Sequence, residues 1–186
     1  MARPRSLSDD EVLGRIAAAL GGTGTTWTLN GAAEAAGLHP ATLIKRFGSR
    51  HGLLLALSRR WIETIPAAAT TNDALRELHH WATSLSECEA SPAQLLARAD
   101  MLLEDLRDPE LRSLLHQGWT KHVSYLTELV QHCQNTGQLT THLSAPGVAR
   151  LLLDAAHGGI LRDAVNTNLD GVKPTNSVLA ALEALS

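Results

Sequence analysis

Residues 29–47 read LNGAAEAAGLHPATLIKRF, two short helical patterns separated by one glycine. In the first pattern, small and apolar residues recur at helical spacing and are followed by Gly37, a residue type that adopts left-handed backbone angles without steric cost. In the second pattern, Pro40 is suited to the first helical position, and His39 precedes it as the capping residue. The sequence therefore predicts a helix, a turn at Gly37 and a second helix that ends near Phe47.

The second helix would bury Leu43 and Phe47, which are four residues apart and share a face. Its remaining residues include two cations and would face outward: Pro40, Ala41, Thr42, Ile44, Lys45 and Arg46. This is the helix-turn-helix arrangement, whose second helix enters the DNA major groove. The alternative is an ordinary helical hairpin in a bundle, because the same pattern occurs in other all-α chains.

The residues on either side of this stretch resemble the TetR-type family of bacterial transcription regulators over roughly residues 8–60. The matching segments keep the family's order and spacing: Ala36-Gly37-Leu38, Leu43-Ile44-Lys45-Arg46-Phe47, Gly48-Ser49-Arg50 and Leu53-Leu54-Leu55. The resemblance implies an all-α fold with an N-terminal three-helix helix-turn-helix head and a C-terminal helical body that binds a ligand and dimerises. The segment Pro66–Asn72 is the expected boundary, which gives a DNA-binding domain over residues 1–66 and a body over residues 67–186.

Two positions depart from the family pattern. Ile44 stands where the family usually has a tyrosine whose hydroxyl reaches a phosphate, and an isoleucine can instead touch a thymine methyl or pack inward. Arg50 replaces the usual lysine and keeps its charge. A cation is electrostatically disfavoured at a helix N-terminus, so a nearby phosphate would explain Arg50, with a solvated arginine as the alternative. The expected DNA-binding residues are Asn30, His39, Pro40, Ala41, Thr42, Ile44, Lys45, Arg46 and Arg50.

The charge distribution supports this assignment. The 186 residues carry a net charge of −3, yet residues 1–60 contain eight Lys/Arg against four Asp/Glu, whereas residues 61–186 contain eight against fifteen. This asymmetry predicts an electropositive DNA-facing end and an acidic body. Near the N-terminus, Arg3 and Arg5 belong to a tail that either frays or lies along DNA.

Composition places the chain among soluble globular proteins, with 44% hydrophobic residues and a mean hydropathy of −0.05. The sequence contains no N-terminal signal pattern and no apolar run of membrane-spanning length, so we expect a cytoplasmic protein without a membrane partner. Cys88 and Cys133 are then expected to be buried thiols, with a disulfide as the alternative.

Local signals mark several helix ends. Ser8 and Glu11 form a capping box, Ser49 is placed to cap the helix after the recognition helix, and Asp108-Pro109 starts a longer helix that Gly137 ends. Gly158-Gly159 lies inside a helical pattern, which indicates either the close approach of a partner helix or a kink or break.

No pattern of catalytic or metal-binding residues stands out. The nine histidines lack zinc-ligand spacing, and neither a Gly-rich phosphate loop nor a nucleophile elbow is present. Asp154 and His157 are three apart and read as either an acid/base pair or an ordinary hydrogen-bonded pair. We therefore expect no enzyme activity, no metal and no cofactor.

The body helices mix bulky apolar and polar residues in a way that suggests a ligand pocket. The expected pocket residues, each with an ordinary core position as the alternative, are Trp81, Met101, Trp119, His122, Tyr125 and His157. Small residues around Gly158 and the apolar face of residues 179–185 predict a homodimer through the last two helices.

The sequence thus predicts a transcriptional regulator that binds double-stranded operator DNA. We expect a repressor that a small-molecule effector releases from a palindromic operator. The alternative is a helical, dimeric binding or scaffold protein that retains the head but does not read DNA.

Overall fold

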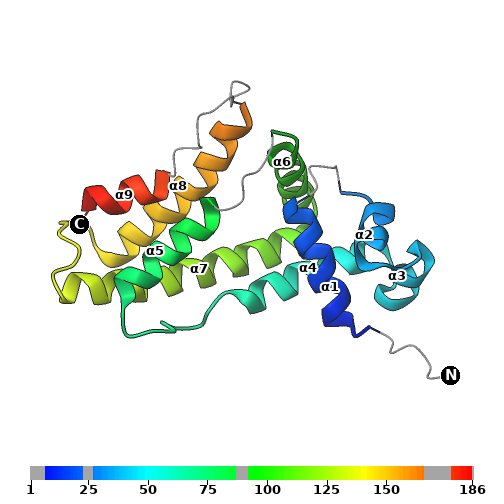
Figure 1. Ribbon diagram of the computed structural model, residues 1–186, viewed down its shortest axis with the longest axis horizontal. Helices are drawn as coiled ribbons and strands as arrows, with labels where there is room; N and C mark the ends of the chain where they lie inside the picture. The colour runs from blue at the N-terminus through cyan, green and yellow to red at the C-terminus, as the bar shows by residue number, and fades with distance from the viewer. Residues whose placement is uncertain (1–6, 23–26, 87–91, 166–176, 186) are drawn as a thin grey trace.

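The computed structural model describes residues 7–22, 27–86, 92–165 and 177–185. This described part contains nine helices and no strand (Figure 1): α1 (Asp9–Gly22), α2 (Leu29–Ala36), α3 (Pro40–Phe47), α4 (Arg50–Thr64), α5 (Ala74–Ser86), α6 (Pro92–Arg107), α7 (Pro109–Asn135), α8 (Ala145–Val165) and α9 (Ser177–Leu185). The predicted all-α class is confirmed. Arg3, Arg5 and Cys88 lie outside the described residues, so the predictions about them are not tested.

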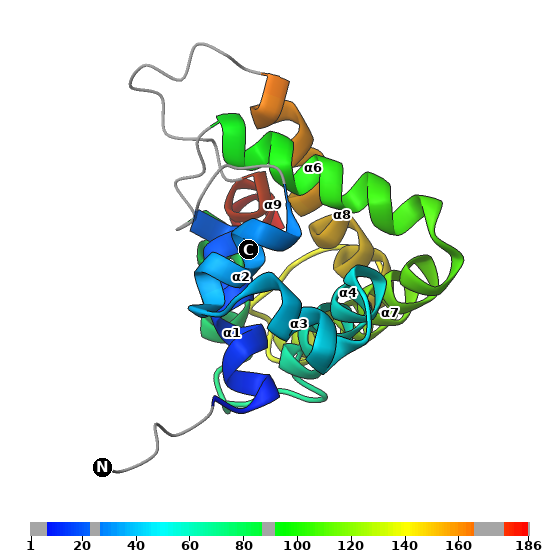
Figure 2. The same cartoon turned by 90° about the vertical axis from the view of Figure 1, so that its right-hand side faces the viewer.

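Helices α1–α4, which we call the head, form the end of the molecule that faces the viewer in Figure 2. Residues of all four helices meet in one apolar cluster, with Ile16 and Leu43 fully buried. Trp27, in the connection before α2, is 6% exposed and belongs to the same cluster. The Ser8–Glu11 capping box holds the start of α1, since each residue's backbone N–H donates to the other's side chain.

A second apolar cluster is built from α5, α7, α8 and α9 and contains Leu78, Leu126, Leu129 and Leu152. Cys133 is buried in it as a free thiol. One helix serves both clusters, because Leu111 in the first turn of α7 packs with the head whereas the later turns of α7 pack in the body. The long helix α7 is therefore shared structure between the two parts.

Helices α4 and α7 lie side by side along the long axis of the molecule (Figure 1). A built Cβ on Gly118 of α7 would lie 2.1 Å from the Trp61 ring of α4, so only a glycine permits this approach. The contact fixes the helix that leaves the head against the helix that runs through the body.

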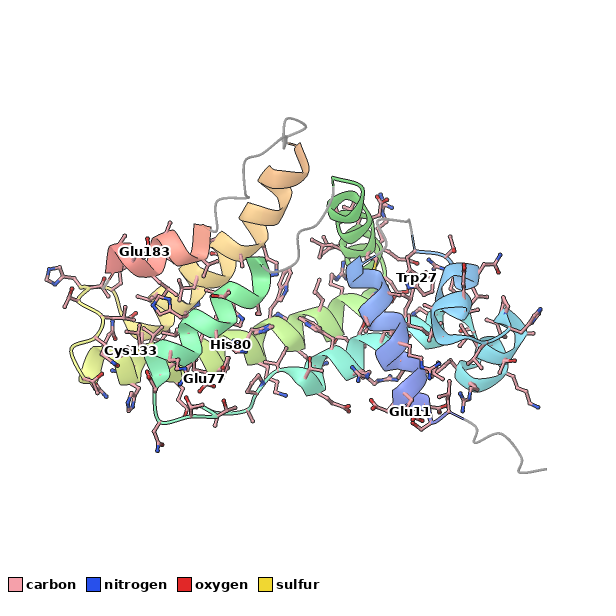
Figure 3. All side chains as sticks on the ribbon, in the orientation of Figure 1. Glu11, Trp27, Glu77, His80, Cys133 and Glu183 are labelled. Atoms are coloured by element: carbon pink, nitrogen blue, oxygen red, sulfur yellow. The ribbon has the colours of Figure 1, made fainter. Side chains whose placement is uncertain are left out.

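The segment between α4 and α5 is fastened by a buried carboxylate, Glu77, which is 7% exposed. It accepts hydrogen bonds from the backbone N–H and the hydroxyl of both Thr70 and Thr71, and from the Tyr125 hydroxyl at 2.7 Å. Figure 3 shows Glu77 at the start of α5, beside this connection. The connection between head and body is thus pinned to α5 and α7.

The last two helices bear on the predicted dimer interface. Helix α8 is continuous from Ala145 to Val165, so of the alternatives left open at Gly158-Gly159 the break into two helices does not occur. Within α9, Val178 and Leu182 are buried in the body cluster of the same chain. Leu182, one residue of the apolar face predicted at the dimer interface, is therefore packed within its own chain, whereas the side chains of Leu179 and Leu185 lie outside the described part, so the interface through the last two helices stays a prediction.

Within the described ranges, no helix is long and apolar enough to cross a membrane.

Candidate functional site

The turn between α2 and α3 has the geometry that the sequence predicted. Gly37 has φ 67° and ends α2, and its N–H donates to backbone carbonyls of that helix. The His39 ring accepts the Ala41 N–H at 3.2 Å and caps α3, with Pro40 in the first helical turn. The two helices are therefore joined by a rigid, capped turn, as in a helix-turn-helix unit.

The outer face of α3 is open. Ala41, Thr42 and Lys45 are exposed, whereas Pro40 and Ile44 are half-buried. Leu43 is fully buried, and Phe47 packs against the same cluster, as the four-residue spacing predicted. At the start of α2, Asn30 is exposed, and so is the capping residue His39. Six of the nine expected DNA-binding residues are therefore exposed: Asn30, His39, Ala41, Thr42, Lys45 and Arg50.

Arg46 is less available than the sequence suggested. Its Nε lies 3.2 Å from Asp9 Oδ1, and its Nη2 donates to the backbone carbonyl of Leu7. The side chain thus ties α3 to the start of α1. Lys45 differs, because it makes no ion pair with any described residue.

Arg50 does not stand unpaired at the start of α4. Its Nη2 donates to Glu104 Oε2 at 2.8 Å, its Nη1 donates to the other oxygen of that carboxylate, and its guanidinium carbon lies 4.5 Å from the centroid of the Trp27 ring. This Glu104 hydrogen bond raises the pKa of Arg50 and lowers the pKa of Glu104, so both groups are charged at neutral pH. The sequence offered a nearby phosphate or solvation as the setting of this cation, and within the described residues it is α6 that supplies an anion.

The next residue also faces acids. His51 Nε2 lies 3.2 Å from Asp108 Oδ2 and 3.7 Å from Glu110 Oε2. Asp108 is the N-cap of α7 and accepts the backbone N–H groups of Glu110 and Leu111. The first turn of α4 is therefore held against the corner between α6 and α7.

Four of the six expected ligand-binding residues take part in two groups of ring contacts in the body. The electrostatic effect of His157 on His122 shows that the two groups are close together, and we call them the aromatic cluster. The His122 ring centroid lies 6.5 Å from that of Trp81, and the Trp119 centroid lies 5.1 Å from that of His157. A fifth member of the aromatic cluster, which the sequence did not indicate, is Trp61 of α4; its ring centroid lies 6.0 Å from that of His122. The cluster thus joins α5, α7 and α8 to the helix that leaves the head.

Both histidines in this cluster are held neutral. Burial, with a further contribution from the nearby His157 and Lys121, lowers the pKa of His122 to about 4. Burial also lowers the pKa of His157, against an opposing hydrogen bond to the Leu153 backbone and the charge of Asp154. Nδ1 of His122 is buried and has no hydrogen-bond partner within the described ranges. A neutral imidazole with a free polar atom among indole rings can bind an aromatic, hydrogen-bonding molecule.

Two of the expected ligand-binding residues lie elsewhere. Met101 of α6 packs against the head cluster rather than among the body aromatics. Tyr125 is 5% exposed and donates its hydroxyl to Glu77, so its polar atom is already used inside the core. Met101 therefore helps to pack α6 against the head, and Tyr125 helps to hold Glu77 beside the connection between α4 and α5.

Within the described ranges, no three His, Cys, Asp or Glu side chains come together in a group that could hold a metal ion. Asp154 is exposed, whereas the His157 ring packs against Trp119. The sequence left open whether Asp154 and His157 form an acid/base pair or an ordinary hydrogen-bonded pair. In the structure the two residues interact electrostatically, since the charge of Asp154 raises the pKa of His157.

Comparisons with known proteins agree with this architecture. No protein-family model matches the chain, and no curated protein matches it by sequence. Solved structures do match. A TetR-family transcriptional regulator from Agrobacterium tumefaciens has a TM-score of 0.68 at 15% identity, covering 95% of this chain and 96% of that one. A TetR transcription regulator from Haloarcula marismortui has a TM-score of 0.65 at 20% identity, covering 94% and 92%. A complex of SmeT with triclosan has a TM-score of 0.61 at 16% identity, covering 95% and 91%.

These likenesses extend over nearly the whole chain. The resemblance to TetR-type regulators that the sequence motifs indicated is thus confirmed at the level of the fold.

Proposed function

We propose that this protein is a sequence-specific DNA-binding transcriptional regulator, with residues 1–66 as the DNA-binding domain and residues 67–186 as the ligand-binding and dimerisation domain. One observation carries the proposal: a capped α2-turn-α3 unit presents an open outer face with Thr42 and the unpaired Lys45. Whole-chain similarity to TetR-family regulator structures supports it. Neither the spacing of residues nor the side-chain geometry favours an enzyme.

The finer part of the proposal is a homodimeric, cytoplasmic repressor that leaves a palindromic operator when a small-molecule effector binds. A dimer with two-fold symmetry would place two recognition helices about one DNA turn apart. Helix α8 offers a surface for the partner: Leu151 is 53% exposed, and a Cβ added to Gly158 would meet no atom of another described segment within 4 Å. A complex with triclosan among the similar structures supports an effector site in a body of this fold.

The effector site that we propose is the aromatic cluster of Trp61, Trp81, Trp119, His122 and His157. Its polar atoms are neutral, and the buried Nδ1 of His122 lacks a partner within the described ranges. A charged effector would have to lose its hydration shell among these neutral rings, which is costly. The effector class that fits is an uncharged aromatic compound with one hydrogen-bonding group.

The second candidate function is a helical binding or scaffold protein that keeps the head but does not read DNA. Two observations favour it: Ile44 replaces the tyrosine that reaches phosphate in the family, and two of the expected DNA-contacting cations, Arg46 and Arg50, are engaged by acids of the same chain. The two candidates differ in a measurable way, because only a DNA-binding protein loses affinity steeply as salt rises.

The test is a fluorescence-anisotropy titration of the full chain with its own upstream DNA and with an unrelated duplex, at several salt concentrations. The Lys45→Ala variant should weaken binding to both duplexes and lower the magnitude of the salt slope by about one. The matched control is Arg76→Ala, which removes one exposed cation from α5, far from the recognition helix. Equal slopes for wild type and Lys45→Ala would remove Lys45 from the interface, and the absence of salt-dependent binding by the wild type would favour the scaffold.

A further inference from the structure

The ion pair between Arg50 and Glu104 joins two residues that are 54 positions apart, one in the first turn of α4 and one near the end of α6. Both terminal nitrogens of the guanidinium donate to the two oxygens of one carboxylate, and one face of the guanidinium covers the Trp27 ring. The fork formed by Nη1 and Nη2 of Arg50 is therefore occupied by the carboxylate, and the Trp27 ring covers one face of the guanidinium.

The fork of an arginine binds a carboxylate and a phosphate with the same two parallel hydrogen bonds. One fork cannot hold both anions in this way. The side chains of Arg50 and Glu104 are 43% and 34% exposed, so water and other anions reach the pair. An ion pair with this much exposure contributes little free energy, so a phosphate can exchange with the carboxylate.

Arg50 also lies at the place where a phosphate is expected. Gly48 ends the recognition helix α3, Ser49 caps α4, and Arg50 is the first residue of α4. The corner directly after a recognition helix faces the DNA backbone when that helix lies in the major groove. Helix α6, which carries Glu104, therefore brings a carboxylate to the edge of the proposed DNA interface.

We propose that Glu104 competes with a DNA phosphate for Arg50, so that DNA binding requires Arg50 to exchange its partner in α6 for the DNA backbone. This inference rests on the proposed DNA-binding function and adds an internal inhibitory contact to it. The contact keeps the DNA affinity of the chain below the value that its cations alone would give.

A simpler account is that any acid near the interface repels DNA. Glu104 lines a surface pocket of about 610 Å³ together with Asp100, Asp108 and Arg107, so it is one of several carboxylates on this surface. Asp100 lies one turn earlier on the same helix, is exposed, and makes no ion pair with a described residue. It is therefore a matched control for the loss of one negative charge without the loss of the Arg50 partner.

The experiment measures duplex affinity by anisotropy, at about 0.15 M salt and over a salt series, for wild type, Glu104→Gln, Asp100→Asn, Arg50→Ala and the double variant Arg50→Ala/Glu104→Gln. Glu104→Gln should bind about three- to fivefold more tightly than wild type, the upper range for releasing an exposed, bidentate ion pair. Its salt slope should stay close to that of wild type, because Arg50 contacts the same phosphate in both complexes and only the cost of releasing Glu104 is removed. In the Arg50→Ala background, the gain from Glu104→Gln should shrink to the small gain seen for Asp100→Asn.

The outcomes separate the two levels of the proposal. If wild type shows no salt-dependent binding to any duplex, the DNA-binding function itself is overturned. If wild type binds but Glu104→Gln gains no affinity, or if its gain persists unchanged without Arg50, then competition for Arg50 is overturned and the proposed function is not. Thermal melts followed by circular dichroism establish that each variant is folded, which is expected because none of the three side chains is buried.

Discussion

Replacing Glu77 with glutamine should cost the protein a large part of the stability of the junction between head and body. Burial alone would raise the pKa of this carboxyl group, but hydrogen bonds from Tyr125, Thr70 and Thr71 outweigh burial and lower the pKa to about 2. A pKa lowered from 4.5 means that the folded state favours the ionised form. Glutamine has the shape of the protonated form, so it loses what the charge contributes.

The size of the loss follows from the shift. A shift of this size corresponds to about 3 kcal/mol of preference for the charged state. The hydroxyl and amide donors come from Thr70 and Thr71, which lie at the surface, so we discount the value for solvent screening to about 2 kcal/mol. For a chain of this length, that loss lowers the melting temperature by roughly 4–8 °C.

The dependence on pH has a definite sign. Because the folded pKa is below the unfolded one, the contribution is present above about pH 4.5 and is lost as pH falls towards 2. The difference in unfolding free energy between wild type and Glu77→Gln should therefore be largest at neutral pH and vanish near pH 2. Urea unfolding at several pH values, followed by circular dichroism, measures it.

Glu128→Gln is the matched control for this measurement. Glu128 is exposed and accepts one long hydrogen bond, from the Ala69 N–H at 3.4 Å, in the same connecting segment. Its substitution should change stability by less than about 0.5 kcal/mol. If Glu77→Gln proves no less stable than Glu128→Gln at pH 7, the charged carboxylate does not hold the connection and the reasoning fails.

Two further substitutions test how the helices are packed. Gly118→Ala places a Cβ 2.1 Å from the Trp61 ring, so it should destabilise the fold by about 1–3 kcal/mol and alter the tryptophan fluorescence. The control is Gly158→Ala, whose Cβ meets no atom of another described segment within 4 Å and should not destabilise the fold; equal melting temperatures for the two variants would contradict the close contact at Gly118. Leu151→Glu should convert the proposed dimer to a folded monomer in light scattering, because it puts a charge on the exposed face of α8 that we propose as the interface. Leu143, which is 46% exposed in a loop, gives the control: Leu143→Glu should leave the dimer intact. If Leu151→Glu is still a dimer, the interface lies elsewhere.

The features that the sequence predicted correctly depend on residues close together in the chain. The capping box of Ser8 and Glu11, the left-handed turn at Gly37 and the cap of Asp108 each involve partners within four positions. Helical spacing likewise identified the buried Leu43 and its partner Phe47. Such signals are local because capping and helix periodicity are properties of one short segment.

The features that the sequence did not predict join separate helices. Tyr125 and Glu77 are 48 positions apart, and Arg50 and Glu104 are 54 apart. Nothing near Arg50 in the chain indicates that a carboxylate from α6 reaches it, so the sequence offers only a phosphate or solvent as the neighbour of its charge. Likewise, the sequence does not indicate that Gly118 is the place where the Trp61 ring enters the aromatic cluster, because the partner lies on another helix.

These long-range contacts bear on how an effector would act in the proposed regulator. An effector changes DNA affinity only by the difference between its affinities for two arrangements of the protein. The His122 ring lies between Trp81 of α5 and Trp61 of α4, and Trp61 has no room to move towards α7 because it already touches Gly118. A ligand that inserts beside His122 must therefore either displace Trp61, and with it the end of α4, or displace Trp81 within the body. Only displacement of Trp61 would move a helix of the head, because Trp61 belongs to α4. The position of the Trp61 ring therefore decides whether effector binding is coupled to DNA release.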